Sequence, residues 1–293
     1  MLINHIALVS QTEQIKLGQL ALVSAALQKQ VARDFMPVWE IESTVDAFEK
    51  LSDVPLGYWP IIIVEDSPKI PEAAGGIHKN QDTGQPFALV RASADWPLTT
   101  SHECLEMLVD PSGNRTIAGN SVKPEQGRVE YLVEVCDPCE AKKFGYSING
   151  VLVSDFYTPY FFDPVQAPGV RYSFSGSIER PRQVLDGGYI SWHDPESKHI
   201  FQLFVEGRSK RFEDLGEAPN GIESLRAFTD RATVAIRRAA MSGKAPANLL
   251  LTAALTANGN GTRRRPVALT RLDESVHASA ASLQTQIDTL LAG

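Results

Sequence analysis

The sequence TTSHECLEMLVDP, residues 99–111, predicts a short helix that begins among hydroxyl side chains and ends before a proline. At about 100° per residue, His102, Glu106 and Asp110 share one stripe of this helix, and Glu103 lies on its flank. Leucine and valine side chains occupy the opposite side. We therefore expect a helix that packs on a core and turns one imidazole and three carboxylates toward a cleft.

The segments before this helix alternate between strand and helix patterns. An apolar β-type run is followed by a helical period that continues to about Arg33, and further extended runs lead to residue 99. Extended segments are expected at residues 2–9, 58–64, 75–78 and 87–92. Residues 34–41 are expected to lead into a further extended region. This order predicts an α/β or α+β layered domain.

The segments after the helix predict hairpins and then a helical tail. We expect a polar connection, a strand over 129–136, a hairpin turning at Asn149-Gly150, and a second hairpin over 187–192 and 199–205. An aromatic cluster over 154–162 either closes the core or lines a cleft.

Beyond Arg208 the composition changes, and we place a soft domain boundary near residue 210. The expected units are a domain over residues 1–210 and a helical C-terminal region over 211–293, which we expect to be the least ordered part. The tail is expected to hold helices over 222–241 and 275–291 with a linker over 256–266.

Composition narrows the classes of protein. The net charge of −7 at pH 7 and the pI of about 5.4 argue against a nucleic-acid partner, and the basic run at 263–265 is expected to be a solvated loop. No apolar run is long enough for a membrane span, and residues 1–9 do not resemble a signal peptide. Three cysteines suit a reducing compartment. We expect a cytoplasmic protein, with export without a leader left open.

The motif His102-Glu103-x-x-Glu106 differs by one residue type from His-Glu-x-x-His, in which two histidines bind zinc and the glutamate is the general base. A carboxylate is a legitimate zinc ligand, so Glu106 is able to replace the second histidine. A second acidic segment follows at Glu134 and Asp137.

At these residues the chain resembles the zincin metallopeptidases. More narrowly it is similar to zincin-like proteins with a His-Glu-x-x-Glu-x-x-x-Asp-Pro helix and a later Glu-x-x-Asp segment, a group that includes the Exordium/phosphate-induced proteins. The resemblance covers roughly residues 2–160, and the matching residues are His102, Glu103, Glu106, Asp110, Pro111, Glu134 and Asp137.

The resemblance implies a mixed sheet with a backing helix and a motif-bearing helix. It implies a zinc-dependent hydrolase, most readily a peptidase, in which His102 and Glu106 hold Zn²⁺ and Glu103 deprotonates the bound water. The substrate would be a peptide or protein aligned on an edge strand near residues 87–92, and its oxyanion would be stabilised by Tyr131, Tyr146, His78 or a later tyrosine.

The third metal ligand stays open. No histidine follows the helix closely, and His193 and His199 are the only later candidates before His277. The ligand is then Asp110, Glu134 or Asp137, and such a carboxylate-rich set binds zinc less tightly than a histidine-rich one. A weak or vacant site is therefore an open alternative.

Two structural alternatives also stay open. Thr100 and Glu103 fit a capping box, and Asp110 fits a turn before Pro111. Cys136 and Cys139 form a Cys-x-x-Cys pair, interpreted as two buried or incidental thiols rather than a zinc or redox site. The alternative function is an inactive zincin-fold binding or assembly protein that docks a protein partner through its C-terminal helices.

Overall fold

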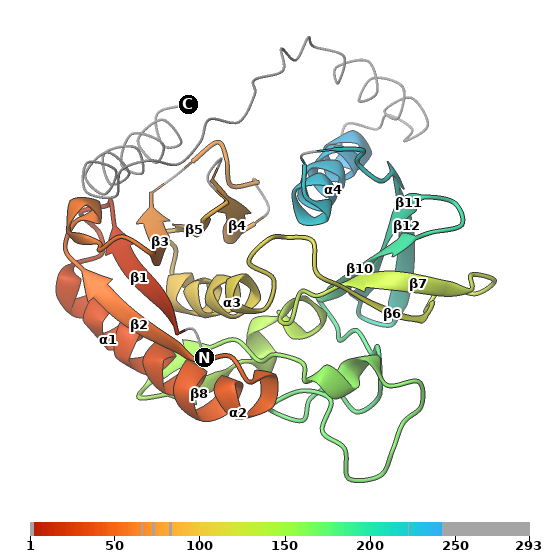
Figure 1. Cartoon of the computed structure of the whole chain (residues 1–293), viewed down its shortest axis with the longest axis horizontal. Coiled ribbons are helices and arrows are strands. Elements are labelled where there is room, and N and C mark those ends of the chain that lie inside the picture. The colour runs from red at the N-terminus through yellow and green to blue at the C-terminus, as the bar shows by residue number, and fades with distance from the viewer. Residues whose placement is uncertain (1–2, 66, 72–73, 82–83, 222, 242–293) are drawn as a thin grey trace, which may run out of the picture.

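The computed structural model describes residues 3–65, 67–71, 74–81, 84–221 and 223–241 of the chain. Figure 1 shows helix α3 at the centre, with one sheet on one side and a second sheet with α4 on the other. The chain therefore has the mixed α/β architecture that its pattern of apolar runs predicts.

The first sheet has the strand order β2-β1-β3-β5-β4. β1, β2, β3 and β5 are parallel, whereas β4 is an antiparallel edge strand paired only with β5. The bounds are β1 Asn4–Ser10, β2 Ser43–Phe48, β3 Tyr58–Val64, β4 Gly76–Asn80 and β5 Pro86–Arg91.

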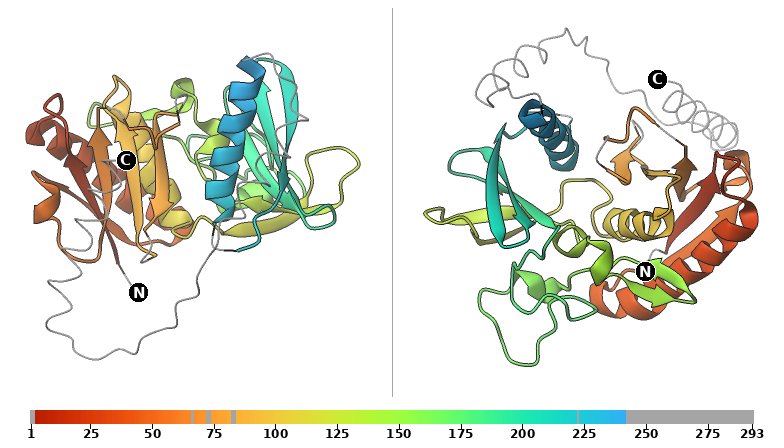
Figure 2. Two further views of the ribbon diagram at one scale, coloured as in Figure 1. Left: turned by 90° about the horizontal axis from the view of Figure 1, so that it is seen from above. Right: turned by 180° about the vertical axis from the view of Figure 1, so that it is seen from behind.

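Two helices cover the same face of this sheet. Alternate residues of β1 and β3, such as Ile6 and Ile61, belong to one buried cluster with Leu27 of α1 (Leu17–Lys29) and Leu105 of α3 (Trp96–Val109). Figure 2 shows both helices against the sheet. α1 continues without interruption through a π-helical segment, Gln30–Phe35, into α2, Met36–Trp39.

The second sheet is antiparallel throughout and has the order β12-β11-β10-β7-β6. Its bounds are β6 Thr116–Asn120, β7 Arg128–Leu132, β10 Tyr189–Asp194, β11 His199–Glu206 and β12 Ser209–Glu217. Helix α4 (Leu225–Met241) packs against β12. The hairpin of β8 (Tyr146–Ile148) and β9 (Val151–Val153) turns at Asn149 and Gly150, both with positive φ, as expected for this dipeptide. The irregular segment between β9 and β10 buries Phe156, Tyr157 and Phe161 in the core.

Three sequence expectations are wrong. Residues 34–39 are helical, since the helix continues past Arg33 through the π-helical segment into α2, which contains Pro37. The strand expected over 129–136 ends at Leu132, so Glu134 and Asp137 lie in an irregular segment that leads into a 3₁₀ turn. The edge strand is β4, because it returns antiparallel along the outside of β5 and leaves residues 87–91 inside the sheet.

The domain boundary expected near residue 210 falls inside β12, which pairs with β11 along its length. The expected linker over 256–266 and helix over 275–291 lie outside the described residues. Among the described residues, no helix is long and apolar enough to cross a membrane.

Candidate metal centre

Helix α3 places the motif in its second turn rather than its first. The helix begins at Trp96 with Pro97 directly after it, so the Thr100 hydroxyl donates to the Trp96 carbonyl at 2.7 Å and is not an N-cap. The capping-box interpretation of Glu103 is therefore wrong. Its carboxylate lies instead against His78 of β4, with 3.2 Å between Glu103 Oε2 and His78 Nδ1.

His102 lies close to two of the predicted acidic ligands. His102 Nε2 lies 3.1 Å from Glu106 Oε2, one helical turn away, and 3.3 Å from Asp137 Oδ1, which arrives from the segment after β7. Glu106 and Asp137 also have carboxylate oxygens within 4.8 Å of each other. Four ligands held tetrahedrally at about 2.0–2.2 Å from zinc lie about 3.3–3.6 Å apart. Each distance from His102 Nε2 is thus close to that of two ligands on one ion. The metal-type groups among the described residues place His102 with Glu106 and Cys136, His102 with Asp137 and Glu140, and Glu106 with Glu134 and Asp137.

The position of Asp137 depends on a glycine of the second sheet. A Cβ added to Gly188 would lie 2.6 Å from the Asp137 carbonyl oxygen and 2.7 Å from that of Pro138. Only glycine lets the start of β10 approach the 3₁₀ turn Asp137–Cys139 this closely. That contact holds Asp137 against α3 and brings Tyr189 to the same site.

Glu134 and Asp110 have other partners. Glu134 receives a hydrogen bond from Arg226 Nη1 of α4, which also donates to Glu106 Oε2 at 3.0 Å. Asp110 accepts from the hydroxyl of Ser112 and from the backbone N–H groups of Asn114 and Arg115 at 2.9–3.1 Å. Asp110 therefore closes the turn after α3, as its second interpretation predicts, and the metal-type clusters found among the described residues do not include it.

Burial and charge shift the protonation of the cluster. Burial disfavours a charged imidazole, but the carboxylates of Glu106 and Asp137 outweigh it and raise the pKa of His102 well above its ordinary value. Burial acts against ionisation of Glu106, yet His102 and Arg226 lower the pKa of this carboxyl. Burial, together with the nearby charge of Glu106, raises the pKa of Asp137 well above its usual range. These shifts favour a protonated His102 beside an ionised Glu106 and a protonated Asp137.

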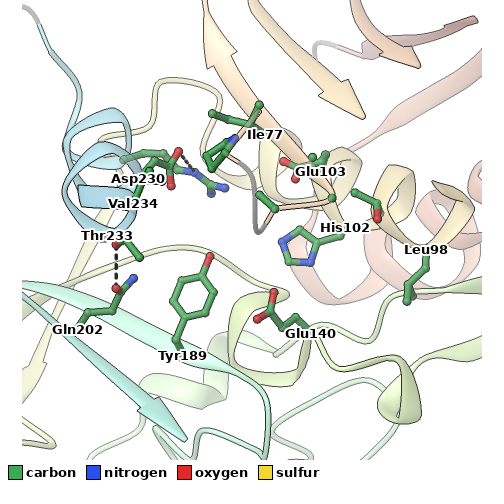
Figure 3. Close-up of a pocket in the computed structure, with 16 residues that line it drawn as sticks. Ile77, Leu98, His102, Glu103, Glu140, Tyr189, Gln202, Asp230, Thr233 and Val234 are labelled. Carbon is green, nitrogen blue, oxygen red and sulfur yellow. Dashed lines mark hydrogen bonds and ion pairs between the residues drawn. The ribbon is translucent and has the colours of Figure 1, made fainter. Parts of the chain in front are cut away.

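A cavity of about 460 Å³ lies beside the cluster, between β4 and α3 on one side and β10, β11 and α4 on the other. His102, Glu103, Glu140 and Tyr189 face it, and Asp230 of α4 lies on the opposite wall (Figure 3). Tyr189 is the later tyrosine that reaches the site.

The hydroxyls of the other two tyrosines considered from the sequence bond elsewhere. Tyr131 contacts Asn120 and Val122, and Tyr146 contacts Gln30 and Asp34.

The two cysteines of the Cys-x-x-Cys pair are free and buried. Burial raises the pKa of both thiols well above the ordinary value, which suppresses the reactive thiolate. The backbone N–H of Cys136 donates to Glu106 Oε1 at 3.2 Å. This pair therefore contributes a backbone contact that orients Glu106.

Sequence reasoning missed Arg226, Glu140 and Asp230 of this site, and it did not single out Tyr189 among the later tyrosines. Glu140 follows Asp137 by three residues and Tyr189 follows a Gly-Gly pair, but neither spacing indicates a metal site. Arg226 is separated from Glu106 by 120 residues, so its contact depends on how α4 returns to α3.

No protein-family model, curated protein or solved structure matches this chain. The function is therefore inferred from the site itself.

Proposed function

We propose that this chain is a zincin-like zinc-dependent hydrolase, most readily a peptidase, with His102, Glu106 and Asp137 as metal ligands and Glu103 as general base. The observation that carries this proposal is the spacing of 3.1 Å and 3.3 Å from His102 Nε2 to one oxygen of Glu106 and one of Asp137. Each separation is close to that of two ligands on one tetrahedral zinc ion. His102 shares one metal-type group with Glu106 and another with Asp137, and Glu106 and Asp137 share a third.

The surrounding fold supports the zincin resemblance. A backing helix and a motif helix share one face of a mixed sheet, and an antiparallel edge strand borders the cavity. Gly75, Gly76 and Ile77 of this edge line the cavity. An extended peptide lying along β4 would pair with its outer backbone groups and pass over the motif helix.

Zinc bound at this centre would supply a Lewis acid and lower the pKa of its bound water. Glu103 faces the cavity beside His102 and would accept the proton of that water. His78 fixes the other side of the Glu103 carboxylate at 3.2 Å. The Tyr189 hydroxyl, which points into the cavity in Figure 3, would donate to the developing oxyanion.

Metal analysis of the purified full chain tests this proposal. We expect one zinc ion per chain after zinc loading and dialysis, and its loss in His102→Ala and Asp137→Asn. His199→Ala is the matched control, since His199 pairs with Asp214 on the surface of the second sheet. The zinc-loaded chain is expected to cleave a fluorogenic peptide library. A wild-type chain that takes up no zinc contradicts the proposal.

The second candidate is an inactive zincin-fold binding protein, and one observation favours it. Arg226 already places a cation 3.0 Å from Glu106 Oε2. The two candidates differ in metal uptake: the binding protein retains no zinc, and its thermal unfolding does not change when zinc is added.

A further inference from the structure

Arg226 is a cationic group of the site that the proposed mechanism does not use. It enters from α4, and its side chain is about nine-tenths buried, with a relative exposure of 8%. Its Nη1 donates to Glu106 Oε2 at 3.0 Å and to Glu134 Oε2, and its Nε lies 3.5 Å from Asp230 Oδ2. One guanidinium therefore touches three carboxylates.

The motif explains why a cation is needed there. In His-Glu-x-x-His the second metal-binding side chain is neutral. Glu106 occupies that position here, is fully buried, and adds a negative charge next to the buried Glu134 and Asp137. A buried carboxylate without a compensating charge is strongly destabilising.

The chain holds Arg226 in place at the end of α3. The backbone N–H of Arg226 donates to the Gly113 carbonyl at 3.0 Å, and that of Leu225 donates to Asn114 Oδ1 at 2.9 Å. Gly113 has a φ of +67°, and a Cβ there would lie 2.9 Å from Ser224 Oγ. The turn after α3, which Asp110 closes, thus anchors the start of α4 and aims Arg226 at Glu106.

We propose that Arg226 is the built-in counter-cation of Glu106: it compensates the glutamate at the second ligand position and competes with the metal ion for Glu106 Oε2. This inference rests on the proposed function, because Glu106 must be a metal ligand. Arg226 is a positioning residue. It holds the metal-free site together and weakens metal binding, since a second cation beside the same oxygen repels a divalent ion.

A double-substitution cycle on the full chain tests the inference. The variants are Arg226→Met, Glu106→His and the combination of both, with Arg231→Met as the matched control. Arg231 lies on the same helix and pairs with Glu223 at its exposed side. The readouts are the Tm of the metal-free protein and the zinc affinity, measured by competition with a chelator well below that Tm.

We expect Arg226→Met to lower the Tm of the metal-free protein and to tighten zinc binding about tenfold or more. A substitution that only damaged the structure would lower both the Tm and the zinc affinity. The combination with Glu106→His restores part of the metal-free Tm, because the uncompensated charge of Glu106 is gone while Glu134 and Asp230 still lack their cation, and Arg226→Lys retains most of the wild-type Tm. Arg231→Met changes neither readout.

Equal or weaker zinc binding in folded Arg226→Met overturns the inference and leaves the proposed function standing. A wild-type chain that binds no zinc overturns both. If Arg226→Met does not fold, Arg226→Met combined with Glu106→Gln takes its place. Glu134 and Asp230 lack their cation in both variants, so a pair that folds no better than Arg226→Met shows that Glu106 is not the carboxylate that Arg226 compensates, and overturns the inference.

Discussion

Glu106 lies in the last turn of α3 and Asp110 is the C-cap residue directly after it, and both are almost fully buried, with exposures of 0% and 1%. Their partners differ. Glu106 contacts Cys136 and Arg226, which are 30 and 120 residues away, as well as His102. The Asp110 carboxylate accepts hydrogen bonds from Ser112, Asn114 and Arg115, two to five residues ahead.

Glu106 therefore belongs to a site assembled from distant elements, whereas Asp110 caps the end of α3. Local side-chain-to-backbone hydrogen bonds are what aspartate makes in any tight turn. A buried carboxylate that gathers cations from distant elements requires the whole fold to bring them together, and such assembly is typical of functional sites. Burial does not distinguish the two residues, and helical periodicity places both on one stripe in the sequence.

The largest effect is expected at Glu103, which lines the cavity. Glu103→Gln removes the proposed base but keeps the shape of the side chain, so it should lower peptide hydrolysis by about 10²- to 10⁴-fold. Zinc content should stay at the wild-type value, because Glu103 is not one of the three proposed ligands. Glu130→Gln is the control, since Glu130 pairs with His193 away from the cavity. Retained hydrolysis in Glu103→Gln would remove Glu103 from its proposed role.

A matched pair of amide substitutions tests the comparison directly. Glu106→Gln removes a proposed ligand and should weaken zinc binding by more than about 100-fold, the upper end of what loss of a supporting residue costs. Asp110→Asn, one turn further along, should leave zinc affinity within about threefold of wild type, because its partners lie outside the cluster. Competition with a chelator measures both. Equal losses of zinc affinity in the two variants would show that Glu106 and Asp110 do not differ in their role.

The convergence of His102, Glu103 and Glu106 followed from helical periodicity alone, and the Asn149-Gly150 hairpin followed from turn chemistry. These features are local, so the sequence was able to predict them. The position of Asp137 beside His102 could not be predicted in this way. It depends on where β7 ends and on the close approach of Gly188 to the Asp137 carbonyl.

Arg226 is the clearest example of a site residue that could not be predicted from the sequence. The sequence suggested a boundary near residue 210 and a helix beyond it, but gave no reason to connect that helix with the motif. The connection depends on β12 pairing with β11 and on the turn after α3 receiving the first residues of α4. Long-range contacts of this kind leave no periodic signal in one sequence.

Asp110→Ala should reduce stability rather than metal binding. The substitution leaves two backbone N–H donors and the Ser112 hydroxyl without their carboxylate, which should cost about 2 kcal/mol, a thirtyfold change in the folding equilibrium. Because this turn anchors α4, protection of the α4 amides from hydrogen exchange should fall with it. Urea unfolding of the metal-free protein measures the cost, and Asp163→Ala in the irregular segment after β9 serves as control. A stability within about 0.5 kcal/mol of wild type would show that Asp110 does not close the turn.

The smallest effect is expected from Gly76→Ala at the start of β4. A Cβ at this position would lie 2.8 Å from Thr99 Cγ2 and 2.9 Å from Glu103 Oε1, so the base must shift by a few tenths of an ångström. Such a displacement should lower hydrolysis by about tenfold, since misplacement by 1 Å costs about 10²-fold.

Zinc affinity in Gly76→Ala should not change, because the added methyl group touches Glu103 and none of the proposed ligands. Gly18→Ala in α1 is the matched control, as a Cβ there meets nothing within 4 Å. A loss of zinc together with activity would mean that Glu103 and the proposed metal ligands move as one unit. Asp110 would then be the only residue of the compared set that is independent of the site.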